Sequence, residues 1–366
     1  MACAFGFVLV LCSLAAGVLA ADGQAFVGLN GNGTNLVLDP PHGGQVVVDG
    51  VAFRGLLQDL AKMKSDIAQL QGAQRRNAAF RAQGLYAIAG SDMNGTSFSS
   101  VESFNHIMGG WTSKPALPVP TSHLAASQAN AVVYAHVATR FFSLEPGATE
   151  WQEWTFPGSQ TVAHSSNSAL EIINNTAFAI GCGVERRGHV FSLDLTTKIW
   201  TRLADMPTPR YAFGSGIYQG TIVCAGGYTL ATGGAVAAFE RFYPAENRWE
   251  TLRSMQVSRF SGAGGILNDH FYMVNGHTFD QGFTNSVERY DFNSQTWEFV
   301  ASTTTARIHL GGAVFNGFLY VFGGSSSGTN ALTLAEKYDP SLDRWTPEPS
   351  MSTQRALFGS TSIQTS

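Results

Sequence analysis

The stretch from Phe271 to Arg307 decides the fold, because its order of segments recurs along the chain. It contains an apolar run ending in glycine, a segment with a glutamate before an aromatic residue, a tryptophan and an arginine: Phe271-Tyr-Met-Val-Asn-Gly276, Val287-Glu-Arg-Tyr-Asp-Phe292, Trp297 and Arg307. The next unit reads Leu319-Tyr-Val-Phe-Gly-Gly324, Ala335-Glu-Lys-Tyr-Asp-Pro340, Trp345 and Arg355. The preceding unit reads Ile222-Val-Cys-Ala-Gly-Gly227, Phe239-Glu-Arg-Phe-Tyr-Pro244, Trp249 and Arg259. The three tryptophans are spaced by 48 residues, and a period of this length indicates a repeat architecture.

The repeat extends toward the N-terminus in weaker form. Six units begin near residues 85, 132, 177, 222, 271 and 319. The third unit ends in Arg210, whereas we assign His123 and His164 to the arginine position after the first two units.

Each unit predicts four short antiparallel strands. In the fifth unit these are 260–267, 271–274, 287–292 and 297–300, which are rich in β-branched and aromatic residues and separated by turn residues. Six such sheets predict an all-β, six-bladed propeller. After Trp345 the chain continues with one more inner-strand motif, Arg355-Ala-Leu-Phe-Gly-Ser-Thr361. We therefore expect this C-terminal strand to complete the blade built from residues 85–118 and so close the ring.

These motifs together resemble the kelch repeat: a Gly-Gly pair after an apolar strand, a Glu-x-aromatic strand, a tryptophan and an arginine that opens the next inner strand. The resemblance covers residues 85–364 and implies a kelch propeller. In kelch propellers that bind acidic peptides, arginines at or beside this position line the pocket. The resemblance thus implies an anion-binding ring at one channel mouth; the alternative is that the repeated arginines bond loop carbonyls and hold the fold. The arginines concerned are Arg210, Arg259, Arg307 and Arg355.

Composition limits the classes of function. The 366 residues include 40 glycines, only 13% are charged, and the net charge is −4, which argues against a nucleic-acid partner. No phosphate-binding glycine loop, His-Glu-x-x-His or Cys-x-x-Cys motif is present, so we predict no cofactor, no metal site and no catalytic residue.

The N-terminus indicates export. Residues 1–20 are uncharged and apolar and end in Val18-Leu-Ala20, which predicts a secretory signal peptide; an uncleaved membrane anchor is the alternative. We expect a secreted or surface protein with no membrane span after signal cleavage. Three Asn-x-Thr triplets are candidate glycosylation sites, at Asn32, Asn94 and Asn174. Cys182 and Cys224 remain in the mature chain, either as a disulfide or as two buried thiols.

A stalk is predicted before the propeller. Residues 21–52 are rich in glycine and valine and indicate short strands or an extended segment. Residues 53–77 predict an amphipathic helix, which either forms a short coiled coil with another copy of the chain or packs on the propeller; the propeller itself is assigned to 84–366. The apolar seam of the helix consists of Phe53, Leu56, Leu60, Met63, Ile67 and Leu70.

Residues that do not repeat are the best candidates for recognition, because loops on a rigid fold usually carry binding. They lie in the loops that follow the second strand of each unit: Asp92, Glu185, Arg186, Arg187, Tyr228, His277, Phe279, Asp280 and Phe283. We expect an exported propeller that binds a protein or a glycan. The alternative is an exported kelch enzyme such as a sialic-acid-type sugar mutarotase, an analogy that rests on fold alone.

Overall fold

The computed structural model describes residues 62–70, 72, 83–106, 108–159, 161–163, 168–183 and 188–364, together with the backbone of four short strands nearer the N-terminus. The chain divides into two compact units, Met1–Asn77 and Ala78–Ser366.

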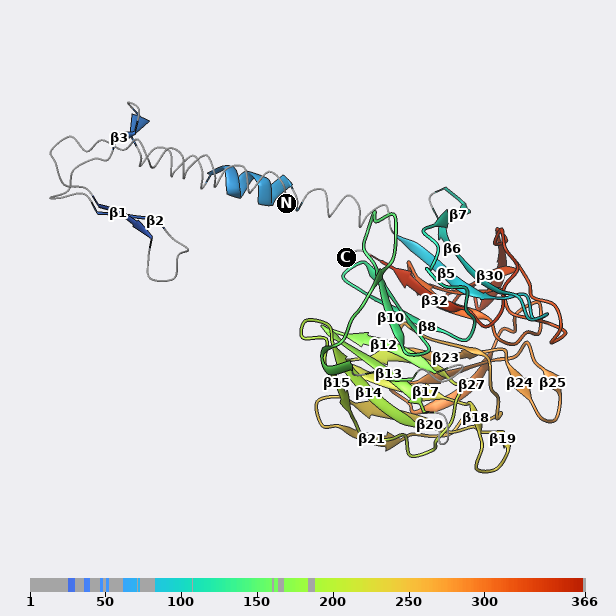
Figure 1. The fold of residues 1–366 in the computed structure, drawn as a ribbon. Helices are drawn as coiled ribbons and strands as arrows, with labels where there is room; N and C mark the ends of the chain where they lie inside the picture. Colours follow the sequence, from blue (N-terminus) through green and yellow to red (C-terminus); the bar gives the residue numbers. More distant parts are fainter. Residues whose placement is uncertain are drawn as a thin grey trace. The chain divides into compact units, whose positions relative to one another are not determined.

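The second unit is a six-bladed propeller, as predicted, and each blade is a four-stranded antiparallel sheet (Figure 1). Blade 2 contains β8 (Ala125–Ala129), β9 (Val132–Val137), β10 (Arg140–Leu144) and β11 (Gln152–Glu153), and a short 3-10 helix, η3 (Pro157–Ser159), follows it. Blade 3 contains β12 (Ala169–Ile173), β13 (Thr176–Cys182), β14 (His189–Asp194) and β15 (Trp200–Arg202). Blade 4 contains β16 (Gly214–Tyr218), β17 (Thr221–Ala225), β20 (Phe239–Tyr243) and β21 (Arg248–Thr251).

The remaining blades follow the same plan. Blade 5 contains β22 (Ala263–Leu267), β23 (His270–Val274), β26 (Val287–Asp291) and β27 (Thr296–Val300). Blade 6 contains β28 (Gly311–Phe315), β29 (Phe318–Phe322), β30 (Ala335–Asp339) and β31 (Arg344–Glu348). Blade 1 joins the two ends of the propeller, with β32 (Gly359–Ile363) beside β5 (Gly84–Ser91), β6 (Ser97–Asn105) and β7 (Gly110–Lys114).

The C-terminal strand closes the ring, which confirms the prediction. β32 pairs antiparallel with β5 from Gly359 opposite Ile88 to Ile363 opposite Gly84. A second link runs through the indole of Trp111 in blade 1, which donates a hydrogen bond of 2.8 Å to the carbonyl oxygen of Pro349, just after blade 6. The tryptophans of blades 2, 4, 5 and 6 donate in the same way to a carbonyl group 36 to 45 residues earlier in the chain.

Small residues allow the six inner strands to approach one another around the axis. A Cβ added at Gly214 would lie 3.0 Å from the Cα of Gly264 on the neighbouring inner strand and 2.7 Å from the sulfur of Met273. Contacts this short are not tolerated, so a side chain at this point would force the two blades apart. This close packing explains why the inner strands are rich in glycine, as the sequence predicted.

Cys182 and Cys224 are buried thiols and do not form a disulfide. Cys182 packs in the hydrophobic core between blades 2 and 3, whereas Cys224 packs in the core between blades 3 and 4. The sheet of blade 3 therefore separates them, and the disulfide considered from the sequence is not formed.

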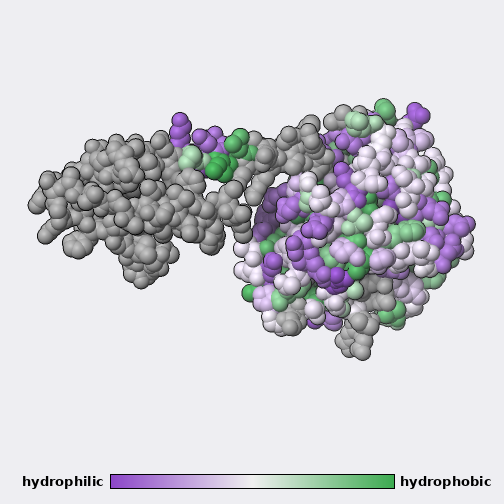
Figure 2. All heavy atoms as spheres, turned by 45° about the horizontal axis from the view of Figure 1, so that its top comes forward, coloured by the Kyte–Doolittle hydropathy of each residue, from purple (hydrophilic) through white to green (hydrophobic). Residues whose placement is uncertain are grey.

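The first unit contains short strands and helix. β1 (Phe26–Leu29) pairs with β2 (Leu36–Asp39), and β3 (Val47–Val48) pairs with β4 (Val51–Ala52). Residues 62–70 and 72 are helical, and no helix among the described residues is long and apolar enough to cross a bilayer. Hydrophobic and hydrophilic side chains lie side by side on this helix (Figure 2). Its seam residues are exposed: Met63 by 47%, Ile67 by 54% and Leu70 by 65%.

Ring closure predicts that a chain truncated after Arg355 will lose its cooperative melting transition. The truncation removes β32 and with it the buried side chains of Phe358 and Ile363. Each such side chain contributes ~2–5 kcal/mol, against a total stability of ~5–15 kcal/mol. Circular dichroism melting measures the effect, with a chain that lacks only residues 364–366 as the control. A truncated protein that melts like this control would contradict closure by β32.

Candidate functional site

The four repeated arginines are buried within the blades and do not face the channel. Arg259 is fully buried, and its Nη2 donates to Glu288 at 2.8 Å while its Nη1 donates to the carbonyl oxygen of Ser286 at 2.9 Å. The Glu288 carboxylate also accepts hydrogen bonds from the backbone N–H groups of Gln256 and Val257, in the loop that enters the blade. The other pairs, equally buried, are Arg210–Glu240, Arg307–Glu336 and Arg355–Glu102.

This geometry contradicts the prediction that the four arginines form an anion-binding ring at a channel mouth. Their guanidinium groups have no exposed surface and are already paired with carboxylates, so an incoming acidic ligand cannot reach them. They join the entry loop of each blade to its second and third strands. Burial alone would raise the pKa of Glu102, but hydrogen bonds from Ser352 and Arg355 outweigh that effect and lower it. The carboxylate therefore stays charged near neutral pH.

The arginine position after blade 1 is Thr121 rather than His123. The backbone N–H of Gly90 donates to the carbonyl oxygen of Thr121 at 2.8 Å. In blade 5 the backbone N–H of Gly276 donates in the same way to the carbonyl oxygen of Arg307 at 3.0 Å. The placement of His123 was wrong by two residues. Thr121 lies ten residues after Trp111, the same step as from Trp297 to Arg307, but it is not basic, and the expectation of a basic residue led to His123. His164 lies outside the described residues.

Residues two positions after the arginine site form a ring around one mouth of the channel. Each has a left-handed backbone with φ between 56° and 60°, and adjacent members are joined across blades by an N–H···O=C hydrogen bond of 2.7–3.1 Å. We call this set the mouth ring: His123, Ala212, Ser261, His309 and Leu357. Burial, reinforced by nearby His123, lowers the pKa of His309 to about 4, so its imidazole is neutral near pH 7.

The channel behind the mouth ring contains a cavity of about 530 Å³, lined by the inner strands. Its lining consists mostly of glycine, alanine, serine and aliphatic residues, and the lining residues include no lysine or arginine. Glu171 is the one acidic residue in this lining. The sequence analysis missed it, although a glutamate within Ala169-Leu-Glu-Ile-Ile173 departs from the small residues of the other inner strands. Within the described part of the chain, no group of three or more metal-ligating side chains is placed to hold an ion.

Aromatic side chains cluster beside the mouth ring on blades 4 and 5. Two hairpins extend there, β18 (Tyr228–Thr229) with β19 (Gly234–Ala235) and β24 (His277–Thr278) with β25 (Gly282–Phe283). The ring centroids of adjacent members lie 5.1–6.3 Å apart, in tilted and edge-to-face arrangements. We call this set the aromatic ridge: Tyr211, Tyr228, Phe260, His277, Phe279 and Phe283.

The ridge brings together several loop residues that the sequence singled out. Phe279 is 56% exposed at its outer edge, and Asp280 is exposed beside it at the hairpin tip. Tyr211 and Phe260 belong to the ridge but were not named as candidates, because they follow the repeated arginines. Glu185, Arg186 and Arg187 lie outside the described residues.

The comparisons with known proteins agree with this architecture. The family model of the kelch motif matches residues 209–256 and 306–352. The chain is 29% identical over 132 residues to Kelch-like protein 15 of Danio rerio, covering 34% of this chain and 21% of that protein. It is 22% identical over 198 residues to Kelch-like protein terF of Aspergillus terreus, covering 48% of this chain and 43% of that protein. The chain thus matches less than half of the length of these curated relatives.

The solved structure of YjhT shares the fold. It superposes with a TM-score of 0.56 at 16% sequence identity, over 68% of this chain and 89% of that chain. At this identity the likeness shows the propeller and nothing about the ligand.

The buried ion pairs predict a large difference between two arginine substitutions. Arg307→Met leaves the Glu336 carboxylate buried without its partner and should cost about 3–5 kcal/mol of unfolding free energy. Arg140→Met removes a surface pair with Glu153 and should cost about 1 kcal/mol or less. Urea denaturation of both variants measures the difference. Equal losses would show that the buried pairs do not hold the blades.

Proposed function

Because this chain belongs to the kelch-repeat family, we propose that it is an interaction protein that binds its partner through the aromatic ridge. Propellers of this family generally bind proteins. The ridge carries the proposal, since large side chains cluster there, with Phe279 exposed and the other five members half-buried.

The propeller fold does not require aromatic residues at the ridge. The same two backbone positions that hold Tyr211 and Tyr228 in blade 4 are Ile308 and Ser325 in blade 6, and Ala356 and Ser91 in blade 1, paired by equivalent bridges. The aromatic residues of blades 4 and 5 are thus additions to a repeat that tolerates small side chains. Aromatic side chains dominate binding energy at protein interfaces, so these additions favour a binding role.

The ridge is held in place before any partner arrives. Phe260 and His277 exchange two backbone hydrogen bonds, of 3.1 and 2.8 Å, and the hydroxyl of Thr278 accepts a hydrogen bond of 3.1 Å from the N–H of Gln281. Phe279 lies at the tip of the β24–β25 hairpin and Leu230 at the tip of the β18–β19 hairpin. Each side chain is more than half exposed. A rigid surface loses little conformational entropy on binding, which favours affinity.

A protein is the partner that the family favours, and a glycan is the alternative, because the faces of aromatic rings also stack on sugars. We infer export from the apolar N-terminal segment, and a secreted or surface location follows from it. The side chains of Asn94 and Asn174 are exposed in turns, where a glycosylating enzyme could reach them. Asn32 lies outside the described residues.

An exported sugar mutarotase remains the second candidate because of Glu171. A non-repeated acid in the channel is what an acid–base enzyme requires. However, the lining residues include no cation to pair with the carboxylate of a sugar acid, and an ionised Glu171 would repel it. We therefore rank binding above catalysis.

We also propose that the stalk helix associates with a second copy of the chain. Met63, Ile67 and Leu70 follow heptad spacing and are each about half exposed or more. Pairing such seams removes apolar surface from water. This would present two or more propellers together, which increases the avidity for a repeated partner.

Binding through the ridge predicts that Phe279→Ser will abolish partner recognition without unfolding the protein. Arrays of extracellular proteins and of glycans, probed with the wild type and the variant, measure the effect. Phe299→Ser is the matched control, because Phe299 is 50% exposed on the outer strand β27, away from the hairpins. The proposal expects signals that Phe279→Ser loses and Phe299→Ser keeps. Equal loss in both variants, or no signal from the wild type, would contradict it.

The stalk predicts a difference in sedimentation between two chains. Residues 21–366 should sediment as an oligomer and residues 78–366 as a monomer, as measured by analytical ultracentrifugation. Ile67→Asp in the longer chain should restore the monomer, because a charge in the seam resists burial. If the longer chain is itself monomeric, the stalk does not oligomerise.

A further inference from the structure

Glu171 breaks the pattern of the inner strands. It lies two residues before the end of β12, at the position that pairs with Phe178 of β13. The corresponding positions of the other five inner strands, defined by the same register, carry small uncharged residues: Ser127, Gly216, Gly265, Ala313 and Thr361. The fold therefore does not require an acid at this place.

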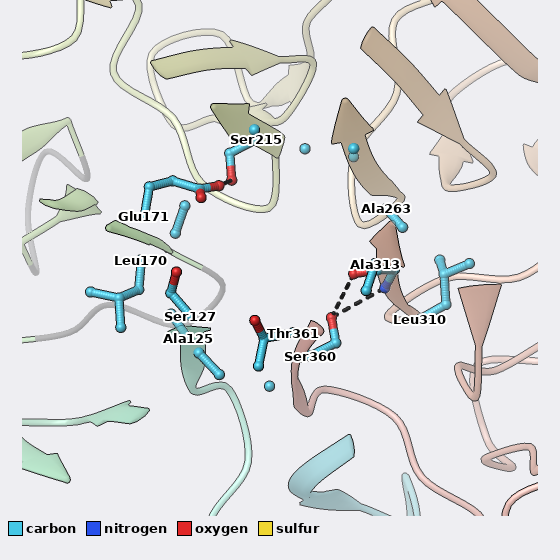
Figure 3. A pocket seen from close by; sticks show the side chains of 18 of the residues that line it. Ala125, Ser127, Leu170, Glu171, Ser215, Ala263, Leu310, Ala313, Ser360 and Thr361 are labelled. Carbon is cyan, nitrogen blue, oxygen red and sulfur yellow. Dashed lines mark hydrogen bonds between the residues drawn. The ribbon is translucent and has the colours of Figure 1, made fainter. Parts of the chain in front are cut away.

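The Glu171 carboxylate lies at the wall of the channel, deep within the propeller. Its side chain extends toward the neighbouring inner strand, where the hydroxyl of Ser215 donates a hydrogen bond of 2.6 Å to Oε1 (Figure 3). The side chain is partly exposed to the cavity, so a ligand in the channel could contact it. Burial raises the pKa of Glu171 to about 7, and the hydrogen bond from Ser215 opposes the shift.

No described cation compensates this carboxylate. The charge of Glu171 acts on the Cys224 thiol of β17, whose pKa burial raises well above its ordinary value, so this thiol stays neutral. The charge of Arg210, which also acts on Cys224, is already paired with Glu240. His309 in the same lining is neutral near pH 7. Ionisation of a carboxylate in this poorly solvated wall is unfavourable without a positive partner, so a cationic ligand that pairs with Glu171 would be stabilised there.

We propose that the channel cavity binds a small organic cation whose ammonium group pairs with Glu171. An ammonium group has three N–H donors and no acceptor, and this part of the lining offers acceptors: the carboxylate and the hydroxyls of Ser127, Ser215 and Thr361 (Figure 3). A cavity of about 530 Å³ is of the size that holds small molecules. Anions are repelled by the carboxylate, and a divalent metal ion lacks a ligand set among the described residues.

This channel site is separate from the aromatic ridge and does not rest on the proposed function. The ridge is built by hairpins on blades 4 and 5, whereas Glu171 projects from the inner strand of blade 3. Loss of either site should leave the other intact.

Isothermal titration of the full mature chain with cyclohexylammonium chloride tests the proposal, with cyclohexanol as the neutral probe of the same shape. We expect saturable binding of the cation at pH 8 and none of the alcohol at the same concentrations. The affinity should fall about tenfold at pH 6, because the carboxylate is then mostly protonated and binding must release that proton. These comparisons use the wild-type protein and need no variant.

Two variants then locate the site. Glu171→Gln keeps the shape of the side chain and should weaken cation binding at least about tenfold, which is the loss of one charge pair in a poorly solvated cavity. Glu298→Gln removes an exposed carboxylate on β27 and should bind like the wild type. The proposal is overturned if the wild type shows no saturable binding, if cyclohexanol binds as well as the cation, or if both variants bind alike.

Discussion

The buried arginine–glutamate pair is the interaction on which the architecture depends. In four blades a guanidinium group with no exposed surface pairs with a carboxylate from the third strand and with backbone carbonyl groups of the same sheet. Removing one partner leaves an unpaired charge in the interior, so the two groups hold each other in place. The pair anchors the loop that leads into the inner strand. The mouth ring lies two residues after the arginine, and the residue directly after the arginine pairs with the first residue of the ridge hairpin in blades 4 and 5.

The same kind of pair also joins the two ends of the propeller chain. Arg355 comes from the segment before β32, and its partner Glu102 lies on β6, near the start of the propeller. The same two ends are joined by the pairing of β32 with β5 and by the hydrogen bond from Trp111 to Pro349. Three different kinds of contact thus close one ring. Closure of the ring fixes the order and spacing of the blades, and so of the loops that they carry.

Much of the fold followed from the sequence, because the repeat dictates its own pairing. The constant spacing of Trp249, Trp297 and Trp345 and the unpaired inner-strand motif after Arg355 sufficed to predict the blades and their closure. The site was less accessible to this reasoning. A repeated arginine near a channel mouth can face either the channel or the sheet, and only the packing decides between them. The expectation of a basic residue misplaced the arginine position after blade 1 by two residues, because Thr121, at the ten-residue step from Trp111, is not basic.

The residues on which the two proposed sites rest are those that depart from the repeat. Tyr228, Phe279 and Glu171 occupy positions where equivalent blades carry other residues, so the fold alone does not require them. Glu171 was not predicted as a site residue. Its position on an inner strand became clear only from the pairing of β12 with β13.

Native-state hydrogen exchange tests the closed ring most directly. If the propeller opens as one cooperative body, the amides of β32 that bond to β5 exchange with the same opening free energy as those of β23, in the middle of the propeller. If β32 instead exchanges by fraying, with an opening free energy several kcal/mol lower than that of β23, the ring is not closed by its C-terminal strand and the account is wrong.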